Sequence, residues 1–136
     1  MGSPVNLWSM LELARRPRLP SVAVVASDRR LRESLSSVLA ATGRVDVIGS
    51  AADSLAALRL ARSGRADVVL VDPILGADGR LLASLRRRAP AARILLVDWD
   101  GPSRSVRAPD VDGVLDATSM PAALFEALAA VPLASD

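Results

Sequence analysis

Two aspartates are the residues best placed for chemistry, because each follows an apolar run typical of a buried strand. Asp72 closes the run Val68-Val69-Leu70-Val71, and Asp98 closes a second run that ends at Val97. A carboxylate in such a place can bind a hard cation or take part in group transfer. A lone aspartate at a strand end more often only caps a loop. The elements around the two residues must therefore decide between these interpretations.

Composition removes several kinds of chemistry from consideration. The chain has no cysteine and no histidine, so it has no thiolate, disulfide, imidazole base or imidazole metal ligand. All 17 of its basic residues are arginines, and the formal net charge is only +2. No uninterrupted apolar stretch reaches the roughly 18 residues of a membrane span. The run Arg86-Arg87-Arg88 is interpreted as a solvated helix end, with nucleic-acid contact as the weaker alternative.

Five short apolar segments alternate with stretches of helical period. This pattern predicts an α/β domain in which helices cover both faces of a parallel sheet. Strands are predicted at Ser21 to Ala26, Val45 to Gly49, Asp67 to Val71, Arg93 to Val97 and Gly113 to Leu115. Helices are predicted after the cap Asp28, from Asp53 to Ser63, from Gly79 to Arg88 and from Ser119 with Pro121 in its first turn. The first helix is expected to bury Leu31, Leu35, Val38 and Leu39.

Two parts of the chain depart from this alternation. Gly101-Pro102 and Pro109 bracket so few residues that the fourth helix should be a stub or a loop. Residues 1–20 form an N-terminal extension and linker, residues 21–131 the domain, and residues 132–136 a C-terminal tail. The apolar stripe Leu7, Trp8 and Leu11 in the extension is too short to be a stable helix alone, so it is expected to dock on its own domain, on a partner or on a second copy.

The element order, together with the segments 45–51, 66–72 and 92–97, resembles the receiver domains of bacterial response regulators, especially those attached to LuxR-type helix-turn-helix outputs. The resemblance covers residues 21–131. It implies a flavodoxin-like, doubly wound sheet of five parallel strands in the order 2-1-3-4-5, with a pocket at the carboxyl ends of the strands.

Receiver domains hold Mg²⁺ with paired acids after the first strand and accept a phosphoryl group on an aspartate after the third. The resemblance implies that Asp72 is at the phosphoacceptor position. It puts Ala26 and Ser27 at the acid pair and leaves Asp28 one place too late. The loop after Asp72 is one residue shorter than usual and has Gly76 where a proline is usual.

The other residues of the pocket also depart from the family pattern. Asp98 takes the place of the Ser or Thr that follows the phosphoryl group, Ala117 takes the place of the lysine, and Val114 replaces the aromatic switch residue. Asp98 could imitate a phosphoryl oxygen beside Asp72, or it could be a solvated loop residue. Two nearby carboxylates repel unless a cation such as Arg29 or Arg30 approaches.

These departures predict an atypical receiver, or pseudo-receiver, that binds proteins without being phosphorylated. It is expected to be no enzyme, to hold no metal or cofactor, and to act in the bacterial cytoplasm in signalling or transcriptional regulation. The expected partner is another protein or a second copy, without contact to nucleic acid or membrane by this chain alone. Leu7, Trp8, Leu11 and Trp99 are the expected interface, although Trp99 could instead pack over the shortened fourth helix. The alternatives are a phosphorylatable receiver domain and a regulatory domain cut from a DNA-binding output domain.

Overall fold

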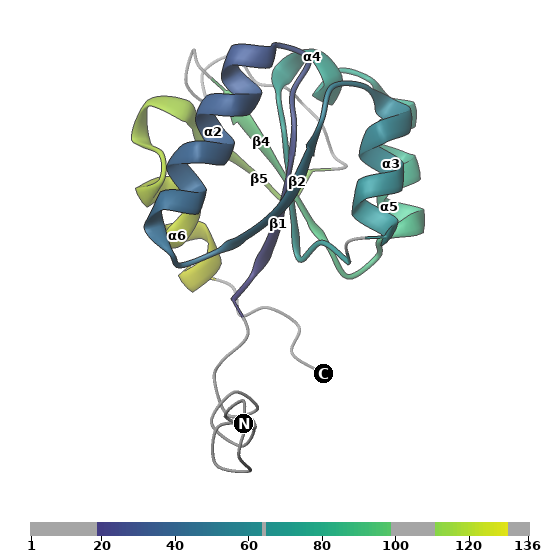
Figure 1. Cartoon of the computed structure of the whole chain (residues 1–136). Coiled ribbons are helices and arrows are strands. Elements are labelled where there is room, and N and C mark those ends of the chain that lie inside the picture. Colours follow the sequence, from purple (N-terminus) through teal and green to yellow (C-terminus); the bar gives the residue numbers. More distant parts are fainter. Residues whose placement is uncertain (1–18, 64, 99–110, 131–136) are drawn as a thin grey trace, which may run out of the picture.

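A five-stranded sheet lies at the centre of the computed structural model, which describes residues 19–63, 65–98 and 111–130 (Figure 1). The strands are β1 (Ser21–Val25), β2 (Asp46–Ala51), β3 (Val68–Val71), β4 (Arg93–Asp98) and β5 (Gly113–Asp116). All neighbouring strands are parallel, and their order is β2-β1-β3-β4-β5. This order confirms the flavodoxin-like topology predicted from the sequence.

Helices cover both faces of the sheet, as Figure 1 shows. On one side lie α2 (Arg29–Thr42) and α6 (Ala122–Ala130), and on the other lie α3 (Ser54–Ser63) and α5 (Gly79–Arg88). Two short elements lie just after strands: α4 (Pro73–Gly76) is one residue beyond β3, and the 3-10 turn η1 (Ala117–Ser119) begins at the end of β5. Both therefore lie at the carboxyl edge of the sheet, where the site was predicted.

The central strands are valine-rich because each of their faces packs against a helical layer. Val22 and Val24 of β1 belong to the apolar layer beneath α2 and α6. Ala23 and Val25, which alternate with them, belong to the layer beneath α3 and α5. This alternation follows from the two-residue period of a strand, and burial on both faces explains why β1 and β3 read as continuous apolar runs.

Three details of the sequence interpretation are wrong. Val38 is 40% exposed, because the buried stripe of α2 follows a spacing of four through Leu31, Leu35 and Leu39 and leaves Val38 at its edge. The last helix begins at Ala122 instead of Ser119, because the Asp116 side chain closes the η1 turn first and the helix starts after Pro121. The short helix α4 was not predicted.

Several predictions fall outside the described residues. They concern the shortened fourth helix, the N-terminal extension with Leu7, Trp8 and Leu11, the C-terminal tail, and Trp99. The domain boundaries likewise stay predictions. In the part of the chain that the structure describes, no helix is long and apolar enough to cross a membrane.

Candidate functional site

Asp72 lies at the carboxyl end of β3, the middle strand of the sheet, and is 3% exposed. Its backbone N–H donates to the Val25 carbonyl at 3.0 Å, and its carbonyl accepts from the Gly76 N–H at 2.7 Å. Its side-chain Oδ1 accepts from the Leu75 N–H at 2.8 Å. Asp72 is therefore the N-cap of α4, and Pro73 occupies the first helical turn, where a missing N–H costs nothing.

Ser27 provides the other hydrogen bonds to this carboxylate. The Ser27 backbone N–H donates to Asp72 Oδ2 at 2.9 Å, and the Ser27 hydroxyl donates to the same oxygen at 3.0 Å. Ser27 is the second residue after the end of β1, so the contact joins the carboxyl ends of two neighbouring strands. At the position where the resemblance implies an acid, the chain thus has a hydrogen-bond donor.

The Asp72 carboxylate is satisfied by neutral donors. Its two oxygens accept three protein hydrogen bonds, of the roughly four that a carboxylate can accept. Among the described residues, the two ion pairs are Arg29–Glu33 and Arg86–Asp112, and neither includes Asp72. Hydrogen bonding to backbone and hydroxyl donors therefore compensates for burial of the carboxylate, without a paired cation.

Asp98 ends β4, the next strand of the sheet, and is 6% exposed. The alternative that Asp98 is a solvated loop residue is therefore wrong. In the strand register Asp98 lies opposite Asp116 of β5, and Ala117 follows at the start of η1. Ala117 is itself buried and has no polar side-chain atom, so the end of β5 offers no cation to the site.

The arginines proposed as counter-charges are used elsewhere. Arg29 pairs with Glu33 at 3.0 Å on the exposed surface of α2, and Arg30 is also exposed. Asp28 caps α2, because its Oδ1 accepts from the Arg30 N–H at 2.8 Å and the Leu31 N–H at 3.4 Å. The structure thus confirms Asp28 as a helix cap, whose carboxylate accepts hydrogen bonds from the first turn of α2.

One arginine that the sequence interpretation missed does reach the edge of the site. The Arg32 guanidinium donates from Nη1 to the Ala26 carbonyl at 2.9 Å. It fixes the end of β1, and so the strand end from which Ser27 reaches Asp72. The spacing of six residues between donor and acceptor gave no local signal for this contact.

Asp116 has a different environment at the same edge of the sheet. Its Oδ1 accepts from the Thr118 hydroxyl at 2.7 Å and the Thr118 backbone N–H at 2.9 Å. These hydrogen bonds, the hydroxyl first, lower the pKa of the Asp116 carboxyl below its usual value. Asp116 is therefore held ionised as the cap of η1.

The residues around Asp72 do not fit a Mg²⁺ ion. Magnesium takes hard oxygen ligands and usually needs carboxylates from the protein. Within the described ranges, no group of three or more histidine, cysteine, aspartate or glutamate side chains could hold a metal. Moreover, Oδ2 of Asp72 already accepts two hydrogen bonds from Ser27.

Comparison with known proteins gives a clear fold assignment. No protein-family model and no curated protein matches the chain. Among solved structures, the signal receiver domain of the response regulator NarL from Mycobacterium tuberculosis is 28% identical with a TM-score of 0.67, over 84% of this chain and 96% of that one. A LuxR-family two-component response regulator from Aurantimonas sp. SI85-9A1 is 26% identical with a TM-score of 0.68, over 82% and 84% of the two chains.

A more distant likeness supports the fold alone. The chemotaxis protein CheY4 of Vibrio cholerae is 22% identical with a TM-score of 0.65, over 83% of this chain and 98% of that one. The structural neighbours of the chain are thus receiver domains of two-component response regulators, and the chain has their fold.

Proposed function

We propose that the chain is an atypical receiver that acts as a phosphorylation-independent protein interaction module in bacterial signalling or transcriptional regulation, in the cytoplasm. The observation that carries this proposal is the contact between Ser27 and Asp72. In a phosphorylatable receiver, an acid at this position would help to hold the metal ion. Here a neutral residue donates two hydrogen bonds to the carboxylate instead.

The surrounding charges support the same proposal. Phosphoryl transfer spreads negative charge over three oxygens, and cations must neutralise it. Ala117 supplies no ammonium group at the end of β5, and the chain contains no lysine. Asp98, at the position where the resemblance implies a Ser or Thr hydroxyl, is a buried carboxylate at the end of β4. Each of these features raises the free energy of a phosphorylated Asp72.

Intact-mass measurement tests the proposal. The chain is incubated with a small phosphodonor and Mg²⁺, beside a phosphorylatable receiver domain as a positive control. We expect no gain of mass in the chain while the control gains one phosphoryl group. A stoichiometric phosphoryl gain that disappears in Asp72→Asn would refute the proposal and establish the second candidate, a phosphorylatable receiver domain. That candidate is favoured by one observation, the aspartate retained at the carboxyl end of β3.

Self-association is the second part of the proposal. Val114 is 40% exposed on β5, which is an edge strand. Its neighbour Leu115 packs in the layer beneath α6, so Val114 leaves an exposed apolar side chain on the other face of this strand. We propose that the stripe Leu7, Trp8 and Leu11 binds such a surface on a second copy, with Trp99 as an additional anchor. Light scattering should give the mass of a dimer, and deletion of residues 1–16 should give a monomer. Unchanged mass and unchanged melting temperature after the deletion would contradict this arrangement.

A further inference from the structure

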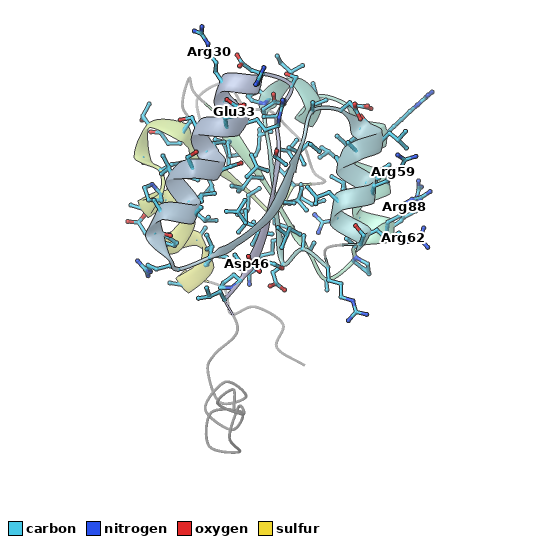
Figure 2. All side chains as sticks on the ribbon, viewed as in Figure 1. Arg30, Glu33, Asp46, Arg59, Arg62 and Arg88 are labelled. Atoms are coloured by element: carbon cyan, nitrogen blue, oxygen red, sulfur yellow. The ribbon has the colours of Figure 1, made fainter. Side chains whose placement is uncertain are left out.

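Arginine side chains gather on the outer surface of two neighbouring helices. α3 and α5 lie in contact on one face of the sheet and bury their apolar sides against it. Neither helix contains an acidic residue. Figure 2 shows the labelled Arg59, Arg62 and Arg88 extending to the same side of the molecule. We call the arginine face six exposed residues: Arg59 and Arg62 of α3, Arg65 just after α3, and Arg80, Arg87 and Arg88 of α5.

The arginine face has no internal counter-charge. Among the described residues, none of its six members forms an ion pair with a carboxylate, and Arg87 donates only to the Ser84 hydroxyl, at 3.3 Å. Three acids are nearest in sequence, and their carboxylates accept hydrogen bonds from other groups. Asp53 and Asp78 accept at the N-terminal ends of α3 and α5, and Asp67 accepts from Ser21. The other 11 arginines share the rest of the chain with all 15 acidic residues. The part of the chain that the structure describes therefore presents six exposed arginines that have no paired carboxylate, in a chain with little net charge.

Helix stability accounts for only part of this arrangement. Cations in the last turn of a helix interact favourably with its dipole, which explains Arg62, Arg87 and Arg88. Arg59 lies in the middle of α3, and Arg80 lies in the first turn of α5, where the dipole opposes a cation. Like charges three or four residues apart also destabilise a helix. A negatively charged partner would relieve this repulsion.

An exposed apolar side chain lies at the N-terminal end of the arginine stripe of α3 and indicates the kind of partner. Leu55 is 61% exposed and precedes Arg59 by four residues and Arg62 by seven, so the three share one stripe of α3. A nucleic-acid backbone offers phosphates but no apolar group for Leu55. A long polyanion would also extend beyond the face and meet the acidic remainder of the chain. A short acidic protein segment that contains an apolar residue fits both features.

We propose that the arginine face binds an acidic segment of a partner protein, with carboxylates on the arginines and an apolar side chain on Leu55. Guanidinium groups suit this role because they bind carboxylates with two parallel hydrogen bonds. Each of the two helices has ten residues, about 15 Å at 1.5 Å per residue, so the face matches a segment of a few helical turns. The inference rests on the proposed role as an interaction module, but it uses residues remote from Asp72.

Fluorescence anisotropy with a labelled peptide tests the inference on the full chain without any phosphodonor. The probe is a peptide of about 15 residues, long enough to match the face, in which glutamates surround one leucine. Arg59→Glu with Arg87→Glu should weaken its binding at least about tenfold, because attraction is replaced by repulsion. The matched control, Arg29→Glu with Arg30→Glu on α2, changes the net charge equally and should weaken it less than about twofold. Thermal unfolding verifies that each variant is folded.

A double-mutant cycle tests the apolar contact. Leu55→Ser and replacement of the peptide leucine by serine should each weaken binding, and the two changes together should cost no more than one alone. The inference is refuted if the α2 control loses as much peptide affinity as the Arg59→Glu, Arg87→Glu variant. It is also refuted if a peptide with glutamine in place of glutamate binds equally well, because the face would then not be specific for carboxylates. Tighter binding of a DNA duplex that depends on Arg59 and Arg87 would assign the face to nucleic acid. If Asp72 is phosphorylated and the peptide still binds specifically, the proposed function is overturned but the inference about the arginine face stands.

Discussion

Replacing Ser27 by aspartate should convert the site into one that requires a metal ion. The Ser27 hydroxyl is 3.0 Å from Asp72 Oδ2, so the new carboxylate would lie close to an existing one. Two unit charges about 4 Å apart repel by about 4 kcal/mol at an effective dielectric constant near 20. Because residue 27 is exposed, water screens this repulsion, and we expect the free energy of unfolding to fall by about 1–2 kcal/mol. The melting temperature of a domain of this size should then fall by about 4–12 °C.

Magnesium should restore the lost stability of Ser27→Asp and should not stabilise the wild type or the Ser27→Asn control. The paired carboxylates would supply the hard oxygen ligands that Mg²⁺ prefers, and only the folded chain would present them together. At about 100 times its dissociation constant the ion would return about 2.7 kcal/mol. Circular dichroism melting in EDTA and in millimolar Mg²⁺ measures both effects, with Ser27→Asn as a neutral control of the same size. If Ser27→Asp melts like Ser27→Asn under both conditions, residue 27 does not occupy a metal-ligand position and our account of the site is wrong.

Two further predictions concern the same edge of the sheet. Gly76→Ala should lower the free energy of unfolding by about 1–3 kcal/mol, because the new Cβ would collide with the buried Leu96 side chain. Gly79→Ala is the control, because its Cβ would meet open space and should not lower the free energy of unfolding. Urea unfolding measures this free energy for both variants. Thr118→Val should raise the pKa of Asp116 toward its ordinary value, as followed by NMR titration. A carboxyl whose pKa is lower in the folded than in the unfolded chain stabilises the fold at pH values above its unfolded pKa. This stabilisation is lost as the pH falls through the folded pKa. The variant should therefore be less stable than wild type at neutral pH and equally stable in acid.

Much of the fold was predictable because burial on both sides of a parallel sheet leaves a strong signal. The run Val68-Val69-Leu70-Val71 has to be a central strand, and its alternation with helical stripes fixes a doubly wound sheet. Boundaries were less certain where side chains compete with the backbone. Before the last helix, the Asp116 carboxylate closes a separate turn that ends before Pro121. The periodicity of apolar residues could not predict this turn, because a polar side chain forms it.

The site was predictable in position but not in its hydrogen bonds. Matching the chain to receiver domains put Ser27 beside Asp72, yet which groups donate to the carboxylate depends on how two strand ends approach each other. The helix after Asp72 had a local signal, since an aspartate followed by proline is a common helix start. The arginine face could not be found from the sequence, because Arg59 and Arg87 come together only when α3 and α5 pack side by side.

The hydrogen bonds of Asp72 change how genetic experiments on this chain should be interpreted. A substitution at the acceptor aspartate is the usual way to ask whether a regulator works through phosphorylation. Here Asp72→Ala also removes the cap of α4 and the acceptor of both Ser27 donors, at a cost of about 1 kcal/mol for the cap alone. A mutant phenotype at residue 72 would therefore report damage to the corner between β1 and β3 as readily as a lost signal. Ala117→Lys adds a cation at the end of β5 and removes no side-chain hydrogen bond, so it tests the missing charge separately from the contacts of Asp72.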